Sequence, residues 1–157
     1  MKLEKKYMRL AIQEARKNLK TGHGGPFGAC IVRDGKVIAL ERNKVLVSDA
    51  TAHAEINAIR SASRKIGNFD LSGSVIYSTT EPCPMCFSAI HWARLEAVIY
   101  GTTIADVKKL GFNELRISSR KMQTSGKSDV RISSGFLRKE CLKLLKDWDA
   151  SPDKRLY

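Results

Sequence analysis

Strand and helix patterns alternate through the middle of the chain, and this alternation restricts the fold more than any other feature. Apolar runs at 29–32 and 37–40 flank Asp34-Gly35, a dipeptide typical of a two-residue hairpin turn. The later elements are predicted in the order helix, strand, helix and strand, at 52–66, 75–78, 84–94 and 97–100. Thr51 is the expected N-cap of the first of these helices. This order favours an α/β fold, in which helices cover both faces of a sheet.

The two ends of the chain also carry helical patterns. Apolar side chains recur at helical spacing from Leu3 to Leu19, and Gly22 ends the pattern. The other predicted elements are a short helix, a polar loop and a final helix, at 104–110, 120–129 and 136–148. No internal repeat or domain boundary is visible, so residues 1–157 are expected to form a single domain.

The composition is that of an ordinary globular protein and favours the cytoplasm. No apolar run approaches the roughly 20 residues that a membrane helix needs, and the first residues lack the pattern of a signal peptide. There are four cysteines, and clustered cysteines in a reducing compartment bind metal more often than they form disulfides. Cys30 and Cys141 lie in apolar surroundings and are expected to be core thiols. We therefore expect a soluble cytoplasmic protein without a membrane partner.

The formal net charge of +12 is unevenly distributed along the chain. Residues 23–106 carry eight basic and eight acidic side chains, whereas 107–145 carry ten basic and three acidic ones. Residues 1–22 carry seven basic and two acidic ones. Such runs are usually solvated faces, and a polyanion-binding site is the alternative interpretation.

Three candidate metal ligands stand at predicted helix starts: His53, Cys83 and Cys86. Two cysteines three positions apart lie on one face of a helix, and the helix N-terminus favours the thiolates that zinc needs. No second Cys-x-x-Cys completes a four-cysteine site, so a histidine must contribute. His53 is the only histidine with a carboxylate two positions later, at Glu55. Both can serve one site only if their helix points its N-terminal end at the metal.

Three protein ligands leave one position on zinc open for water, which indicates a catalytic site. Zinc brings bound water to a pKa near 7, and Glu55 can move the protons of a deamination if it lies near the metal without binding it. A histidine-x-glutamate with Pro-Cys-x-x-Cys is the signature of zinc deaminases of nucleobases. The alternative is a closed structural zinc site with Cys30, His23 or His91 as the fourth ligand.

Two segments, Thr51-Ala-His-Ala-Glu55 and Glu81-Pro-Cys-Pro-Met-Cys86, resemble the cytidine deaminase-like superfamily. This resemblance implies a three-layer α-β-α sandwich with a central mixed five-stranded sheet and one zinc ion between two helix N-termini. Within the superfamily the chain is most similar to bacterial-type guanine deaminases. That similarity lies in four segments, Gly24–Ala29, Glu81–Ile90 with Trp92–Arg94, Gly111–Glu114 and Arg155–Tyr157.

The guanine deaminase resemblance also implies roles for individual residues and for a homodimer. Glu114 would be a second proton-transferring acid, and Tyr157 would cap the site, in this family often from a partner subunit through an exchanged segment at about 135–157. The residues implied to bind the base are Phe27, Asn43, Ala54, Trp92 and Tyr157. The structural alternatives are core aromatics for Phe27 and Trp92, a turn for Asn43, a surface carboxylate for Glu114 and a frayed end for Tyr157.

The expected reaction is guanine plus water giving xanthine and ammonia, a step of purine catabolism. Zinc hydroxide would attack C2, while Glu55 protonates N3 and then the leaving amine. The main alternative is a tRNA adenosine deaminase, because 132–145 resembles the C-terminal helix of those enzymes and 115–127 is strongly basic. Guanosine or cytosine as substrate, and a zinc-binding module without activity, are further alternatives.

Overall fold

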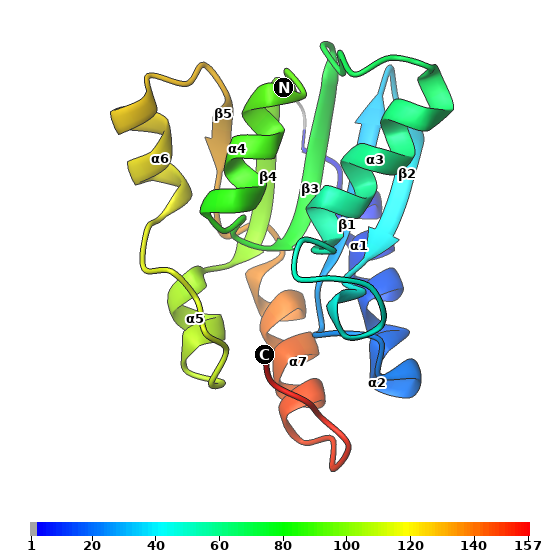
Figure 1. Ribbon diagram of the computed structural model, residues 1–157, viewed down its shortest axis with the longest axis vertical. Coiled ribbons are helices and arrows are strands. Elements are labelled where there is room, and N and C mark those ends of the chain that lie inside the picture. Colours follow the sequence, from blue (N-terminus) through cyan, green and yellow to red (C-terminus); the bar gives the residue numbers. More distant parts are fainter. Residues whose placement is uncertain (1–2) are drawn as a thin grey trace.

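The computed structural model describes residues 3–157 (Figure 1). Five strands form one sheet: β1 (Gly28–Arg33), β2 (Lys36–Arg42), β3 (Ser74–Thr80), β4 (Ala97–Thr102) and β5 (Arg131–Ser133). The helices are α1 (Lys5–Arg16), α2 (Asn18–Thr21), α3 (Ala54–Ile66), α4 (Pro84–Trp92), α5 (Ile104–Lys108), α6 (Ser119–Gly126) and α7 (Arg138–Asp149), with a 3-10 turn at Val45–Val47.

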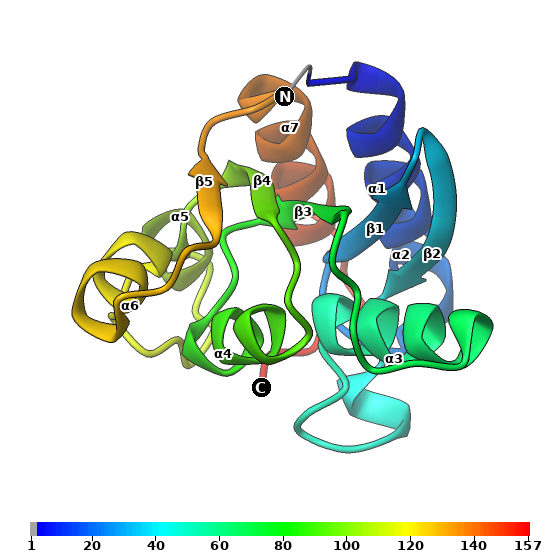
Figure 2. The ribbon, with the colours of Figure 1, turned by 90° about the horizontal axis from the view of Figure 1, so that it is seen from above.

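The sheet is mixed and its strand order is β2-β1-β3-β4-β5. Strand β1 is antiparallel to both β2 and β3, whereas β3, β4 and β5 run parallel. Helices α1 and α7 cover one face of the sheet, and α3 and α4 cover the other (Figure 2). The predicted three-layer sandwich around a five-stranded mixed sheet is therefore confirmed.

Strand β1 shows how the two layers of the core arise from alternating side chains. Ala29 and Ile31 are buried in the cluster that includes residues of α3 and α4. Cys30 and Val32 are buried in the cluster that includes residues of α1 and α7. Successive side chains of a strand point to opposite faces, so a strand covered on both sides must be apolar throughout.

The predicted hairpin is confirmed by its turn geometry. Asp34 and Gly35 join β1 to β2 and both have positive φ, at 49° and 72°. Two left-handed residues in succession make a type I′ turn, whose twist matches that of the flanking strands.

The polar segment 120–129 was expected to be a loop, and this prediction is wrong. Residues Ser119–Gly126 form α6, and Ser118 caps its first turn by accepting a hydrogen bond from the Lys121 N–H. The next strand, β5, was not predicted either. Both elements are too short and polar to show a clear period, and they are stabilised by neighbours distant in sequence, β4 and α4.

Several helix boundaries also differ from those predicted, among them those at Lys17 and Ala54. The N-terminal helix is interrupted at Lys17, which separates α1 from α2. Helix α3 begins at Ala54, and its N-cap is His53 instead of Thr51. The Thr51 hydroxyl donates to Asp49 within the preceding loop, so it does not cap the helix.

Within residues 3–157, no helix combines the length and apolarity that crossing a membrane requires.

Candidate active site

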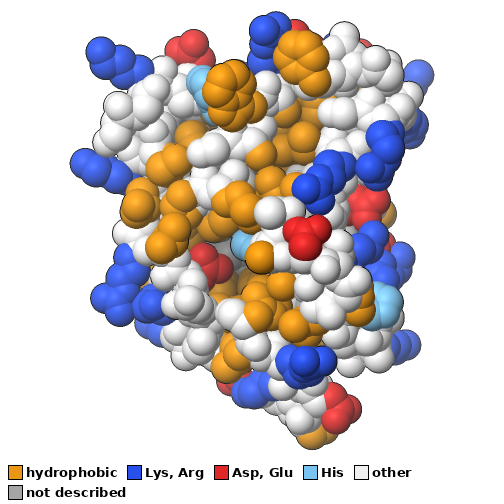
Figure 3. All heavy atoms as spheres, in the orientation of Figure 1, with side chains coloured by type: hydrophobic (Ala, Val, Ile, Leu, Met, Phe, Trp, Pro, Cys, Tyr) orange, Lys and Arg blue, Asp and Glu red, His pale blue; other side chains and the backbone are white. Residues whose placement is uncertain are grey.

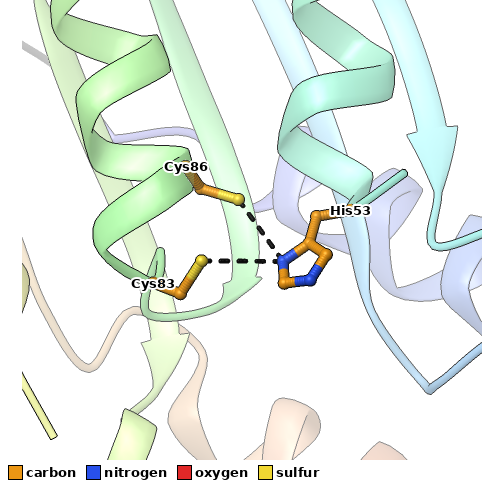
Figure 4. A group of neighbouring side chains, drawn as sticks. All are labelled: His53, Cys83 and Cys86. Carbon is orange, nitrogen blue, oxygen red and sulfur yellow. Dashed lines mark hydrogen bonds between the residues drawn. The ribbon is translucent and has the colours of Figure 1, made fainter. Parts of the chain in front are cut away.

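Helices α3 and α4 each begin at a candidate metal ligand. His53 is the N-cap of α3 and Cys83 is the N-cap of α4, and both have extended backbone. Pro84 occupies the first turn of α4, where a missing N–H costs nothing, and Cys86 follows within the same turn. Their three side chains point toward one another from the two helix starts (Figure 4). The expectation that both helices direct their N-terminal ends at one point is met.

The spacing of these three donor atoms fits a tetrahedral zinc ion. The Nδ1 atom of His53 lies 3.6 Å from Cys83 Sγ and 3.5 Å from Cys86 Sγ. Zinc bonds of about 2.3 Å to sulfur and about 2.0 Å to nitrogen, at tetrahedral angles, separate such atoms by about 3.5 Å. One histidine nitrogen and two cysteine sulfurs at these distances form a zinc-binding site.

The thiols are prepared for metal binding by their surroundings. The hydrogen bond from Cys86 lowers the pKa of the Cys83 thiol to about 4, and His53 contributes to this shift. The Cys86 thiol has a raised pKa, because it donates to Cys83 and is buried. Without a metal the pair thus holds one thiolate, and a bound cation favours both thiolates by releasing the remaining proton.

The residues considered as a fourth protein ligand lie elsewhere. Within residues 3–157 the cluster of metal-binding side chains holds only His53, Cys83 and Cys86. Cys30 is buried on the opposite face of the sheet, and the His91 Nδ1 lies 2.9 Å from Ser128 Oγ. His23 lies beside Arg42. The three-ligand arrangement leaves a coordination position open, as in catalytic zinc sites.

Glu55 lies beside the metal cluster without belonging to it. Its Oε1 accepts a hydrogen bond of 3.0 Å from Ser78 Oγ on β3, and its Oε2 lies 3.5 Å from Cys86 Sγ. The carboxyl group is buried, and burial raises its pKa. A buried carboxyl group beside the metal ligands is placed to accept and donate a proton.

A cavity of about 290 Å³ opens over the metal cluster. This volume is near the lower end of the range for small-molecule sites, about 300 Å³. In Figure 3 the hollow lies near the middle of the face, and hydrophobic side chains border it. The cavity is lined by Phe27, Asn43, Ala50, His53, Glu55, Thr80, Glu81, Cys83, Pro84, Met85, Phe112, Asn113, Glu114, Leu115 and Tyr157.

Glu114 and Tyr157, from distant parts of the chain, both line this cavity. Burial raises the pKa of Glu114 to about 7, with a contribution from the negative charge of Cys83. Burial also raises the pKa of the Tyr157 hydroxyl, which accepts a hydrogen bond of 3.1 Å from the Gly25 N–H. Tyr157 is thus held at the cavity instead of fraying.

Asn43 and Phe27 also line the cavity, and Phe27 packs at the same time against two core clusters. Asn43 is almost fully buried, and its Oδ1 accepts a hydrogen bond of 3.1 Å from the Val45 N–H. The amide nitrogen Nδ2 carries two N–H donors, which suit an acceptor atom of a bound molecule.

Phe112 is a wall residue that the sequence analysis did not single out. Its ring centroid lies 5.2 Å from that of Phe27 and 5.3 Å from that of Tyr157, in edge-to-face contacts. It also contacts Trp148 of α7. In the sequence, only its position within the Gly111–Glu114 segment could have indicated that Phe112 lines the cavity.

Trp92 and Ala54 do not line the cavity of the single chain. Trp92 ends α4, two turns beyond the cysteines, and 77% of its surface is exposed. A helix that starts at the metal carries its last residue away at about 1.5 Å per residue. Ala54 is fully buried in the first turn of α3, so only its backbone faces the helix start. The expected pocket role of Trp92 therefore has no support within one chain.

Known proteins match the chain across this site. Residues 1–102 match the family described as the cytidine and deoxycytidylate deaminase zinc-binding region. A guanine deaminase of Bacillus subtilis is 44% identical over 109 residues, which cover 69% of this chain and 70% of that protein. A tRNA-specific adenosine deaminase of Buchnera aphidicola is 35% identical over 125 residues, which cover 78% of this chain and 79% of that protein. The solved structure of a guanine deaminase from Nitrosomonas europaea gives a TM-score of 0.86 at 27% identity, covering 96% of this chain and 86% of that one.

Proposed function

Because the chain belongs to the cytidine and deoxycytidylate deaminase family of zinc enzymes, we propose that it converts guanine and water into xanthine and ammonia. It is a hydrolase of the C–N bond of cyclic amidines. The observation that carries the choice of a free purine base is the cavity, because Glu114 and Tyr157 help to line a space of only about 290 Å³ over the metal ligands. A single heterocycle fits such a space, whereas a polymer needs an opening for its backbone.

His53, Cys83 and Cys86 hold the zinc ion, which when bound supplies an activated water for attack on the ring carbon that bears the amino group. Glu55 would take a proton from this water and deliver it to the N3 atom of the ring, and would then transfer the remaining proton of the added hydroxyl group to the leaving amine. Burial favours its neutral form, which makes this carboxyl group an effective donor. Glu114 assists as a second acid, since burial raises its pKa to about 7.

The other cavity residues orient the base. Phe27 and Phe112 supply apolar walls for a flat ring, and Asn43 Nδ2 donates a hydrogen bond to a ring acceptor. Tyr157 forms part of the wall beside Phe112. This set of apolar walls with a few fixed polar groups is typical of sites for small heterocycles.

The proposal includes a homodimer. Hydrophobic side chains form a band across the face of the molecule that carries α3 and α4 (Figure 3). Trp92 and Phe69 are exposed by 77% and 65%, and contiguous exposed apolar patches mark protein interfaces. Exchange of segment 135–157 between the two subunits remains a prediction, and in the single chain Tyr157 reaches its own cavity.

The thiolate ligands favour action in a reducing compartment such as the cytoplasm.

A second candidate, deamination of adenosine in tRNA, is favoured by unpaired cations beside the site. A second cavity of about 700 Å³ is lined by Glu81, Lys108, Lys109 and Arg116, among others. In the part of the chain that the structure describes, none of these three cations forms a salt bridge, although Arg138 and Lys143 of α7 do. Unpaired cations of this kind suit phosphate groups.

A substrate panel distinguishes the two candidates. The zinc-loaded protein is incubated separately with guanine, guanosine, adenine, cytosine, cytidine and tRNA, and released ammonia is measured. We expect ammonia and xanthine from guanine. Ammonia from tRNA alone, together with inosine in the tRNA and weaker turnover at higher salt, would contradict guanine as the substrate and support deamination of tRNA adenosine.

A further inference from the structure

Asn18 forms a buried polar junction behind the substrate cavity. It begins the short helix α2, just after the interruption at Lys17, and only 3% of its surface is exposed. It does not line the cavity over the zinc ligands. No chemical step described above uses it.

Both ends of the Asn18 amide are fully engaged. Its Nδ2 donates hydrogen bonds of 2.8 Å to the carbonyl oxygens of Gly25 and Asn43. Its Oδ1 accepts from Arg42 Nε at 3.1 Å and from Thr21 Oγ1 at 3.2 Å. An amide has two donor protons and two acceptor positions, so Asn18 has no remaining hydrogen-bonding capacity. The contacts with Arg42 and Thr21 fix which end of the amide faces the two carbonyls.

The two carbonyls that Asn18 holds belong to segments that line the cavity. The Asn43 N–H donates to the Phe27 carbonyl at 3.0 Å, so the backbones of two cavity residues are joined. The Gly25 N–H donates to the Tyr157 hydroxyl. Asn18 therefore sets the separation between the loop at 23–27, which carries Phe27 and holds Tyr157, and the backbone of Asn43.

Asn18 itself is held from behind by a buried ion pair. Arg42 Nη1 lies 2.7 Å from Glu14 Oε1, and their side chains are exposed by only 16% and 9%. A satisfied buried network of this kind specifies one arrangement, because any shift leaves a polar group unpaired. The loop and Asn43 are thus attached to a rigid base formed by α1 and β2.

We propose that Asn18 is a positioning residue for base recognition, acting through Asn43 and Tyr157. This inference rests on the proposed deamination of a free base in the cavity described above. Loss of the Asn18 donors loosens the loop at 23–27 against Asn43, because only the Asn43–Phe27 backbone hydrogen bond then joins them, and this weakens base binding. The zinc ligands and Glu55 belong to α3 and α4, so the chemical step is little affected.

The test compares Asn18→Asp with Thr21→Val. Asn18→Asp keeps the shape and the acceptor for Arg42, but an oxygen replaces the nitrogen that donates to the two carbonyls. Thr21→Val removes the exposed hydroxyl that donates to Asn18 and accepts a long contact of 3.4 Å from the His23 N–H, and it leaves both carbonyl contacts in place. For each protein we would measure kcat and KM for guanine, the zinc content, and backbone hydrogen exchange at 23–27 and 43–45 without substrate.

For Asn18→Asp we expect KM to rise about tenfold while kcat changes less than about threefold, with one zinc per chain. Hydrogen exchange should become faster in both segments. Thr21→Val should match the wild type in every measurement except exchange at the His23 N–H, whose acceptor it removes. If Asn18→Asp does not fold, Asn18→Ser, whose hydroxyl can serve only one carbonyl, should show the same changes at smaller size.

A folded Asn18→Asp or Asn18→Ser protein with unchanged KM would overturn the inference, as would unchanged exchange in both segments. A lower melting temperature without these changes would mean that Asn18 only supports folding, and would also overturn it. A wild-type protein inactive on guanine contradicts the proposed function instead. The exchange comparison then still decides whether Asn18 positions the two segments, because it needs no substrate.

Discussion

Ser78 on β3 donates a hydrogen bond of 3.0 Å to the Oε1 atom of Glu55 at the start of α3. This contact joins the proton-transferring carboxyl group to the centre of the sheet. The same hydroxyl lies 2.7 Å from the Thr80 carbonyl, so its single proton is shared between this carbonyl and Glu55. The orientation of Glu55 is thus set by the sheet as well as by its own helix.

Ser78→Ala should reduce kcat about tenfold, because a hydrogen bond to a carboxylate is worth roughly 1.5 kcal/mol. The zinc content should not change, since Ser78 does not contact the zinc ligands. Ser74→Ala on the same strand is the matched control, because the buried Ser74 Oγ has no hydrogen-bond partner in residues 3–157. Steady-state kinetics of both variants test this prediction, and equal kcat values would contradict it.

Cys83→Ser should abolish zinc retention during purification and dialysis. A hydroxyl is a much weaker zinc ligand than a thiolate, and the remaining His53 and Cys86 form an incomplete site. The zinc-free variant should also unfold at a lower temperature than the zinc-loaded wild type, because a ligand that binds the folded state stabilises it. Metal analysis and thermal unfolding measure the two effects.

Cys30→Ala serves as the control for Cys83→Ser. Cys30 is buried on the opposite face of the sheet, so its removal should leave one zinc per chain. Loss of zinc from Cys30→Ala would indicate a fourth protein ligand and a closed site.

Glu114→Gln should stabilise the metal-free protein at alkaline pH. Burial raises the pKa of Glu114 from 4.5 to about 7, so folding opposes its ionisation. The penalty is absent below about pH 4.5, grows as the pH rises and is complete above about pH 7. We expect the variant to be more stable than the wild type by about 2 kcal/mol at pH 8 and equal to it near pH 4.

Urea unfolding of metal-free samples across this pH range measures the difference for Glu114→Gln. Metal-free protein is required because a bound cation favours the carboxylate. Glu96→Gln, at a half-exposed surface position, should change stability by less than about 0.5 kcal/mol. A stability difference for Glu114→Gln that does not vary with pH would contradict the assignment.

Asp106→Asn should destabilise the protein by about 1–2 kcal/mol at pH 7. Asp106 accepts hydrogen bonds from Arg138 at 2.7 and 2.9 Å and from the Thr103 N–H, which joins α5 to α7. The Arg138 guanidinium holds the pKa of Asp106 well below its usual range. The stabilisation is therefore complete above about pH 3.8 and is lost as the pH falls further.

Chemical unfolding at pH 7 and pH 3 tests the Asp106 prediction. Asp149→Asn, which removes an exposed pair with Lys154, should cost less than about 0.5 kcal/mol at either pH. Equal effects of the two substitutions at pH 7 would contradict the role given to Asp106.

The zinc site was predictable from the sequence because its determinants are local. Cys83 and Cys86 lie within one turn of one helix, and His53 begins another, so residue type and spacing identify them. The hairpin was predictable for the same reason, since Asp34 and Gly35 form its turn by themselves.

Features that depend on distant contacts were not predictable. Strand β5 has three residues, and only its pairing with β4 makes it a strand. Asn18 is an ordinary polar residue among lysines in the sequence, and its contacts lie with carbonyls 7 and 25 positions away. Trp92 was expected from the family resemblance to bind the base. In a single chain it lies outside the cavity, because it is at the far end of α4.

The most direct test of the central claim is one measurement on one variant, ammonia release by Glu55→Gln together with its zinc content. Glu55 lies beside the zinc ligands without joining them, so the variant should keep one zinc per chain and release no ammonia from guanine above background. Ammonia release at the wild-type rate, or loss of the zinc ion, would contradict the role of Glu55 as a proton-transferring group that does not bind the metal.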